Sequence, residues 1–384
     1  MKILLLAPHP FYQERGTPIA VDLLIRALVH HEHHVDVLTY HEGISPAYDG
    51  EVTIQRIAPP RGAHDVRPGF SLRKLQCDAA MWPVAIRLAG SGGYNIVHAV
   101  EESVFMAMRI KRRFGVPYVF DMDSSMPAQI ADKLRWARPL LPMMRAFERR
   151  AIRGAAAVVP MCDALADLAR AAGARQVTVL RDVALVTGAE PPTLGWRRTL
   201  GCQGVVFLYL GNLEPYQGID LLLNSFARAA AERPEAALIV AGGRPEDIAR
   251  YKARAATLRV GAKVHLVGPQ PLSAMGAVFA EADVLVSPRI AGNNTPMKIY
   301  SYLGAGKPTL ATRLPTHTQV LNTHNAMLCD PTPEAFATGM LALAHDPALR
   351  AALADAAARD ADTQYSLSAF QGTVGALYKQ LTSG

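Results

Sequence analysis

Short apolar segments recur along the whole chain, and each is separated from the next by a longer segment with helical periodicity. Their apolar residues do not alternate with polar ones, which is typical of strands covered by helices on both faces of a parallel sheet. In the first half we expect strands at 3–7, 35–39, 52–57, 96–100, 118–122, 156–160 and 177–180. In the second half we expect them at 205–210, 238–241, 264–267, 284–287, 309–311 and 326–329. This order predicts an α/β protein with two doubly wound, Rossmann-like domains.

The length of the chain fits two such domains, because 384 residues that are 50% hydrophobic can form two buried cores. The segment between the two series of strands carries Pro and Gly at 187–198 and predicts a linker. We therefore expect an N-terminal domain at 1–182, a linker at 183–200 and a C-terminal domain at 201–360. Residues 361–384 predict a last amphipathic helix that packs back on the N-terminal domain.

The composition of the chain and its first apolar segment indicate the cellular compartment in which we expect the protein. The four cysteines lack C-x-x-C spacing, which argues against a disulfide framework or a structural zinc and favours the cytoplasm. The apolar run after Met1 is short and broken by prolines, so it reads as a strand and not as a signal peptide. No apolar window is long enough to span a membrane. A net charge of +7 allows anionic partners without selecting among them, so we expect a cytoplasmic protein that is soluble or peripheral on a membrane.

In sheets of this kind ligands bind in the loops that follow the strands. The first such loop contains Gly16, Thr17 and Pro18, where Thr17 suits the N-cap and Pro18 the first helical position. A glycine beside a helix N-terminus lets a diphosphate approach, although an ordinary capped turn explains the same residues equally well. The loop is not G-x-G-x-x-G, which disfavours a nicotinamide-dependent dehydrogenase.

The corresponding loop of the second half is Leu210-Gly-Asn-Leu-Glu-Pro-Tyr-Gln-Gly. It resembles the Gly-Arg-Leu-x-x-x-Lys-Gly turn that opens the donor domain in family-four retaining glycosyltransferases of the GT-B fold, whose two domains face each other across a cleft. The resemblance implies that Gly211 begins the donor loop. Asn212 and Gln217 take the places of the Arg and Lys that hold the donor diphosphate. An amide can donate a hydrogen bond to a phosphate but cannot neutralise it, so the compensating charge must come from elsewhere.

A second resemblance follows at 279–289, which is similar to the helix and strand that precede the paired glutamates of the same family. In the family one glutamate faces the donor sugar, and another, eight positions later, holds the ribose. Counting back from Gly306-Lys-Pro, these positions are Asn293 and Ser301. Both residues can still hydrogen-bond a hydroxyl, which favours a variant enzyme over an inactive one.

The same loop supplies further candidates for contacts with the donor. Asn294 lies beside Asn293, and the N–H groups of Thr295 and Met297 precede an expected helix at 297–303. Arg289 and Lys298 flank the loop. A cation at a helix N-terminus opposes the helix dipole, so we expect an anion beside Lys298; the alternative is a solvated lysine lying along its own helix.

On the acceptor side, Ile96-Val-His-Ala-Val resembles the family's Val-Val-His-x-His, whose second histidine contacts the donor sugar. Val100 stands at that position, so catalysis by that imidazole is excluded. Glu101 and Glu102 come directly after it. His98 is interpreted as a hydrogen-bonded polar group within the strand, with a catalytic role as the alternative.

The strand at 118–122 leads into Asp121-Met-Asp123, and a period of two places both carboxylates on one face. They are interpreted as residues that orient or deprotonate the acceptor hydroxyl, as structural caps, or as ligands of a metal on the diphosphate. Two-domain glycosyltransferases work without metal, so we expect none. The expected catalytic residues are Glu101, Glu102, Asp121, Asp123 and Lys298.

Residues 133–153 interleave seven cations with large apolar side chains. On a helix from Met143, one stripe would contain Arg145, Arg149 and Arg153. Such a surface suits an anionic bilayer or a lipid-linked acceptor, and it also suits an ordinary surface helix with its apolar side in the core. Nucleic acid is disfavoured, because the aromatic residues form no stacking row among the cations.

The resemblance as a whole implies a hexosyltransferase-like enzyme. It would move a sugar from a nucleoside diphosphate to an acceptor hydroxyl with retention at the anomeric carbon, in glycolipid or polysaccharide assembly. The nucleotide sugar is a co-substrate, and no cofactor is expected. Two alternatives remain: a nucleotide-sugar epimerase or hydrolase of the same fold, and a catalytically silent subunit that partners an active enzyme.

Overall fold

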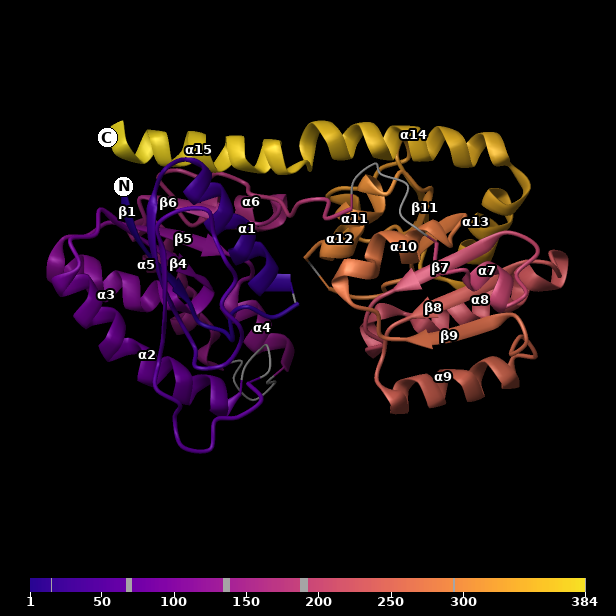
Figure 1. Cartoon of the computed structure of the whole chain (residues 1–384), viewed down its shortest axis with the longest axis horizontal. Coiled ribbons are helices and arrows are strands. Elements are labelled where there is room, and N and C mark those ends of the chain that lie inside the picture. The colour runs from indigo at the N-terminus through magenta and orange to yellow at the C-terminus, as the bar shows by residue number, and fades with distance from the viewer. Residues whose placement is uncertain (15, 67–70, 134–138, 187–192, 293, 384) are drawn as a thin grey trace. The chain divides into compact units, whose positions relative to one another are not determined.

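The computed structural model describes residues 1–14, 16–66, 71–133, 139–186, 193–292 and 294–383 (Figure 1). The chain forms two compact units, one made of Met1–Asp182 with Ser368–Gly384 and the other of Val183–Leu367. Each unit contains a six-stranded parallel sheet with helices on its two faces (Figure 1). The expected α/β class with two Rossmann-like domains is thus confirmed.

The first unit has the strand order β3-β2-β1-β4-β5-β6. Its strands are β1 (Lys2–Ala7), β2 (His34–Thr39), β3 (Val52–Arg56), β4 (Ile96–Val100), β5 (Tyr118–Met122) and β6 (Ala157–Pro160). Its helices are α1 (Gly16–His30), α2 (Leu72–Ser91), the short 3₁₀ helix η1 (Glu101–Ser103), α3 (Val104–Phe114), α4 (Met126–Lys133), α5 (Leu141–Gly154), α6 (Asp163–Ala171) and the last helix α15 (Leu367–Ser383). In this order the chain reverses direction across the sheet between β1 and β4.

One expected strand is wrong. Residues 177–180 form only an isolated bridge between Val158 and Val177, at the edge of the sheet. The N–H groups of Thr178 and Leu180 still donate to the carbonyls of β6. The segment is apolar because Val177 packs against the core of the unit, and not because it belongs to a full ladder.

The second unit has the strand order β12-β11-β10-β7-β8-β9. Its strands are β7 (Val206–Leu210), β8 (Ala237–Ala241), β9 (Val264–Gly268), β10 (Val284–Ser287), β11 (Thr309–Thr312) and β12 (Met327–Cys329). Its helices are α7 (Trp196–Thr199), α8 (Ile219–Glu232), α9 (Pro245–Thr257), the 3₁₀ helices η3 (Pro215–Gln217) and η4 (Leu272–Ala274), α10 (Met275–Ala280), α11 (Met297–Gly304), α12 (Pro315–Thr318), α13 (Pro333–His345) and α14 (Pro347–Gln364). Here the reversal lies between β7 and β10.

The cores follow from strands that are buried on both faces. Leu4 and Leu6 of β1 pack with α2 and α3, while Ile3 and Leu5 are fully buried on the opposite face. Each fully buried leucine or isoleucine contributes roughly 1.5 to 3 kcal/mol to folding. Burial on both faces is therefore the reason why the apolar runs showed no alternation.

Two glycines allow the loops after β7 and β8 to touch. Gly242 has a φ of +121°, and a Cβ atom there would overlap the carbonyl oxygen of Gly211, whose own φ is +148°. The N–H of Gly211 donates to the carbonyl of Ala241 at 3.0 Å. The loop after β7 is therefore held by a backbone contact that only glycine permits.

We predict that Gly242→Ala lowers the free energy of unfolding by about 3 kcal/mol, because it adds a backbone clash to a conformation that L-residues avoid. Gly62→Ala is the matched control. Gly62 also has a positive φ, of +76°, but its Cβ position is open, so we expect a loss of only about 1 kcal/mol. Urea unfolding of both variants measures the difference. Equal losses would contradict the assigned contact.

Candidate active site

The reversal between β7 and β10 places two loops side by side in the second unit. The N–H of Ile290 donates to the carbonyl of Tyr216 at 2.9 Å, which joins the loop after β10 to the loop after β7. Gly218 has a φ of +75° and lies against the carbonyl of Pro288, where a Cβ atom would overlap it. The donor-side residues expected from the sequence therefore belong to loops that contact each other.

Lys298, in the first turn of α11, carries an enclosed amine. Its stem is partly exposed, but Nζ is buried and has no hydrogen-bond partner among the described residues. Nζ lies 3.9 Å from the ring centroid of Tyr209 and 3.4 Å from the position that a Cβ atom on Gly211 would take. Burial, with a smaller contribution from the charge of Arg289, lowers the pKa of Lys298 well below its ordinary value. The solvated lysine considered from the sequence is therefore wrong.

Arg289 holds the loop after β10 in shape. Its Nε donates to the carbonyl of Ala291 at 2.8 Å, one terminal nitrogen donates to the carbonyl of Asn294 at 3.2 Å, and its guanidinium lies 5.0 Å from the ring centroid of Tyr216. Burial lowers its pKa. A second cation thus lies in the same electropositive region as Lys298.

His317 lies close enough to Lys298 and Arg289 for their positive charges to affect its pKa. Its ring nitrogens are hydrogen-bonded to Ser287 at 2.9 Å and to the carbonyl of Thr312 at 2.9 Å. Its pKa is lowered to about 4 by burial, and the charges of Lys298 and Arg289 add to the shift. The imidazole is therefore neutral at physiological pH, and it adds no positive charge of its own.

Two more buried polar atoms on these segments lack partners among the described residues. They are Oε1 of Gln217, at the end of η3, and Oγ1 of Thr295, just before α11. Met297 is the first residue of α11, so its N–H has no partner within the helix. Asn212 is exposed, and its Oδ1 accepts a hydrogen bond from Glu214 N–H at 3.4 Å. These groups leave hydrogen-bonding capacity for a ligand.

The two positions aligned with the paired glutamates give different results. Asn293 lies outside the described residues. Ser301 is fully buried in α11, and its hydroxyl accepts a hydrogen bond from Leu185 N–H at 3.4 Å. It faces the interior of the unit, so the contact with the ribose that the alignment implied is not favoured by this geometry.

The reversal between β1 and β4 places a group of carboxylates in the first unit. Glu101 directly follows β4 with a φ of +48°, a left-handed conformation that is rare for glutamate. Burial, together with the charge of Glu102, raises its pKa to about 7. Glu102 is instead ion-paired with Lys74 of α2, which also donates to the carbonyl of Pro8 at 2.8 Å. Lys74 therefore joins α2 both to η1 and to the loop after β1.

Asp121 lies near the end of β5, and Asp123 directly follows the strand. His98 Nε2 lies 3.2 Å from Oδ2 of Asp121. Asp123 accepts a hydrogen bond from the hydroxyl of Thr17, and its pKa is raised well above the ordinary value by burial and by the charge of Asp121. Helix α1 begins at Gly16, so Thr17 is its second residue and not the expected N-cap. The first turn of α1 thus supplies Thr17 to the carboxylate group.

Asp182 was missed by the sequence reasoning. It is buried, and its pKa is raised to about 7 by burial and by the charge of Asp121. The available signal was its position two residues after the apolar run at 177–180, which lies along β6. A last strand that leads directly into a linker predicts no functional loop at this point, so the sequence did not indicate Asp182.

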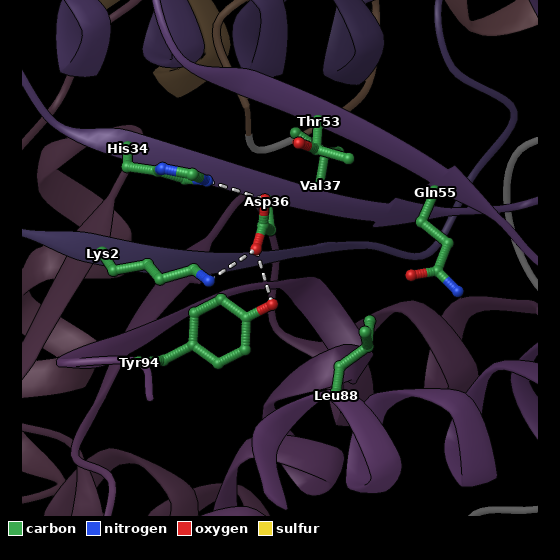
Figure 2. Close-up of a pocket in the computed structure, with 8 residues that line it drawn as sticks. All are labelled: Lys2, His34, Asp36, Val37, Thr53, Gln55, Leu88 and Tyr94. Carbon is green, nitrogen blue, oxygen red and sulfur yellow. Dashed lines mark hydrogen bonds and ion pairs between the residues drawn. The ribbon is translucent and has the colours of Figure 1, made fainter. Parts of the chain in front are cut away.

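Two other features lie apart from these carboxylates. A cavity of about 270 Å³ opens at the amino-terminal half of the first sheet, where Lys2, His34 and Tyr94 all point to Asp36 (Figure 2). The hydroxyl of Tyr94 donates to Asp36 at 2.7 Å, so this carboxylate is already satisfied. The second feature is a group of three side chains that could hold a metal ion. Its members are His41, Glu42 and His64, and within the described residues one ligand atom from each lies within 4.8 Å of the other two.

Comparisons with known proteins agree with the fold and with the division of the chain. A family profile described as "Glycosyl transferases group 1" matches residues 201–360, and one described as "Glycosyl transferase 4-like domain" matches residues 15–182. No curated protein sequence is detectably similar.

Solved structures match the whole chain. Sucrose-phosphate synthase from Thermosynechococcus elongatus has a TM-score of 0.79 at 18% identity, over 100% of this chain and 99% of that one. Anabaena HepE in complex with UDP has a TM-score of 0.74 at 16% identity, over 100% of both chains. WaaG, a glycosyltransferase involved in lipopolysaccharide biosynthesis, has a TM-score of 0.69 at 16% identity, over 100% of both chains. At such identities the solved structures show the fold, whereas the two profiles show the family, and the chain belongs to the family-four-like glycosyltransferases of the GT-B fold.

Proposed function

We propose that this enzyme uses a nucleoside diphosphate sugar as donor and transfers the sugar to an acceptor hydroxyl with retention of configuration. The observation that carries the proposal is the enclosed Nζ of Lys298, an amine without a counter-charge beside the glycine loop of the donor-side unit. Structures of HepE, which has the same fold, contain UDP and UDP-glucose. A diphosphate would supply the negatively charged partner that this amine does not have within the described residues.

The energetics of Lys298 favour an anionic ligand. Removing an ammonium from water without a partner costs several kcal/mol, which is why its pKa is lowered in the free protein. A diphosphate oxygen at this position would restore the charged form, and the N-terminus of α11 would add the favourable end of its dipole. Donor binding is therefore coupled to uptake of a proton by Lys298.

The same groups can assist the chemistry. As the bond between the anomeric carbon and the phosphate oxygen breaks, negative charge develops on the departing diphosphate, and Lys298 and Arg289 stabilise it. The acceptor oxygen bonds to the anomeric carbon from the side that the diphosphate leaves, and the hydroxyl proton passes to a phosphate oxygen. Asp121 and Asp123 orient that hydroxyl by accepting or donating hydrogen bonds.

The alternatives differ in a simple assay. An epimerase or hydrolase would convert the donor without an acceptor, whereas a silent partner subunit would bind no nucleotide sugar. A screen of nucleotide sugars for thermal stabilisation followed by product analysis separates the three, since a ligand that binds only the folded state raises the melting temperature.

We also propose that α5 places the enzyme on the cytoplasmic face of an anionic membrane and that its acceptor is lipid-linked, as in glycolipid or polysaccharide assembly. Within the described residues, no helix is long and apolar enough to cross a bilayer. The core-facing side of α5 consists of Glu148, Ala151 and Ile152, whereas Met143 and Phe147 are 54% and 53% exposed. The apolar side chains that remain outside are thus not used by the core.

Three cations of α5 form a stripe on another side of the helix from Met143 and Phe147. Arg145, Arg149 and Arg153 are all exposed, and they follow each other at intervals of four residues along the helix. Apolar residues inserted at the level of the headgroups, beside arginines that contact anionic lipid, are the arrangement of an interfacial helix. Residues 134–138 of the basic stretch, including Trp136, lie outside the described residues.

Replacing Lys298 by Met should raise the activation free energy of transfer by about 2 to 4 kcal/mol. This change lowers the rate roughly 30-fold to 1,000-fold. The melting temperature of the free protein should stay the same or rise, because a buried amine without a partner is removed. Calorimetry of donor binding in buffers of different ionisation enthalpy should show proton uptake by the wild type and none by the variant. Lys252→Met on the exposed face of α9 is the control. Transfer at the wild-type rate by a folded Lys298→Met protein would refute the assignment.

Excess chelator should leave transfer unchanged, because the proposed charge compensation comes from side chains and not from a divalent ion. The assay is the initial rate before and after chelation, with the variant His64→Gln measured in parallel. This variant controls for metal held by His41, Glu42 and His64. Loss of activity with chelator and recovery with manganese in both proteins would overturn the proposal and return Asp121 and Asp123 to a metal role.

The enzyme should sediment with vesicles of anionic phospholipid at low salt and be released as salt increases. Replacing Arg145, Arg149 and Arg153 together by Gln should abolish sedimentation. Replacing Arg250, Lys252 and Arg259 by Gln removes the same charge from an exposed region of the second unit and should have little effect. If wild-type protein ignores anionic vesicles at low salt, a water-soluble acceptor replaces the lipid-linked one.

A further inference from the structure

The last helix of the chain contributes a buried phenol to the first unit. Tyr378 of α15 is 1% exposed, and its hydroxyl lies 2.7 Å from Nδ1 of His98, which is fully buried in β4. The two rings are nearly parallel, with centroids 6.3 Å apart, and His33 lies 5.4 Å from the phenol on another side. Tyr378 is thus hydrogen-bonded to a residue 280 positions earlier in the sequence, on the strand that leads to Glu101.

The placement of α15 is fixed by further contacts. Nε2 of His31 is hydrogen-bonded to the carbonyl of Gln371 at 2.8 Å, and Gln176 donates to Gln380 at 2.5 Å. At Gly375 the helix backbone comes so close to His31 that a Cβ atom would overlap its ring. The hydroxyl of Tyr378 is therefore held at a defined position relative to β4 and is not a loosely packed end of the chain.

The hydrogen positions follow from the chemistry of the partners. Burial raises the pKa of Tyr378, and the charge of Asp121 adds to the shift, so the phenol keeps its proton and donates to Nδ1 of His98. The hydrogen of a neutral imidazole is then on Nε2. That nitrogen lies 3.2 Å from Oδ2 of Asp121 and donates to it. One tautomer of His98 is selected by the phenol, and that tautomer points its N–H at Asp121.

Asp121 is singled out by this contact within the carboxylate group. Burial raises the pKa of Glu101, Asp123 and Asp182, and the negative charge of Asp121 contributes to each of the three shifts. The imidazole N–H occupies Oδ2 of Asp121 and leaves Oδ1 for another donor. The side chain is 15% exposed, so an acceptor hydroxyl can reach it.

We propose that Tyr378 is a positioning residue for glycosyl transfer, which acts through His98 to hold Asp121 as the carboxylate that orients the acceptor hydroxyl. The proposal rests on the proposed function, since it assigns Asp121 to the acceptor. The C-terminal helix then completes the site of the first unit. Removing the hydroxyl of the phenol leaves the buried ring in place but frees His98 to adopt either tautomer.

The test is Tyr378→Phe, with Tyr94→Phe as the matched control. Tyr94 is also buried in the first unit, and its hydroxyl donates to the carboxylate of Asp36 at the cavity away from the proposed site (Figure 2). We expect Tyr378→Phe to lower kcat about tenfold, with the donor KM unchanged, as when a group that orients a functional side chain is lost. Tyr94→Phe should leave kcat within about twofold.

Two further measurements separate positioning from stability. In the Asp121→Asn background, Tyr378→Phe should have almost no additional effect on kcat, because the group it orients is already changed. Nitrogen-15 NMR of the His98 ring should show the Nε2–H tautomer in the wild type and a mixture of tautomers in Tyr378→Phe. Rates that fall equally in Tyr378→Phe and Tyr94→Phe, or that fall additively with Asp121→Asn, would show a general loss of stability and overturn the proposal.

Failure of the proposed function looks different. If the wild-type protein neither is stabilised by nucleotide sugars nor transfers sugar, the donor assignment is wrong, whatever the NMR result. If the wild type transfers sugar while Tyr378→Phe does so with an unchanged kcat, only the positioning role is wrong.

Discussion

The parallel direction of the hydrogen-bonded strands determines where this protein can act on a ligand. Every crossover returns the chain to the same end of its sheet, so all loops that follow strands lie at one edge. Where the strand order reverses, the crossovers leave on opposite faces of the sheet, and ligands bind beside the loops at that point. This occurs between β1 and β4 in one unit and between β7 and β10 in the other. Every residue argued to touch donor or acceptor lies on the loops or helix starts at these two reversals, or at the end of β5 beside one of them.

The fold could be predicted because burial of both sheet faces leaves a local signal, the unalternated apolar run. The prediction failed at 177–180, because a run beside a four-residue edge strand cannot be distinguished locally from a strand. For the same reason, Asp182, which follows this run, was not predicted as a site residue. Ser301 shows another limit: its alignment position was clear, but which side of α11 faces the loops depends on packing against residues far away in the sequence, such as Leu185.

The donor side shows how one chemical requirement can be met from a different position. The resembling family holds the diphosphate with two cations on the first loop, whereas here Asn212 and Gln217 occupy those places. The amine of Lys298 comes from α11, the helix that follows β10, and lies close to the first loop at Gly211. In the proposed function, the cost is a buried amine without a hydrogen-bond partner, whose pKa is lowered in the free protein, and the benefit is a group already placed where negative charge would develop. A requirement for charge therefore constrains the site more strongly than the identity of the residue at any one motif position.

The carboxylates of the first unit, which are negatively charged where Lys298 and Arg289 are positive, lower the stability of the folded protein at neutral pH. Glu101 and Asp182 have pKa values near 7 in the folded chain, well above the value of about 4 for an unfolded carboxyl. Such groups contribute stability below pH 4, and this contribution is lost as the pH rises through 7. At neutral pH the first unit therefore keeps carboxylates together at the expense of stability, and Glu101 adds a left-handed backbone. The core of this unit needs neither feature. In the proposed function, a ligand with several hydroxyl groups would donate hydrogen bonds to the carboxylates and offset their repulsion.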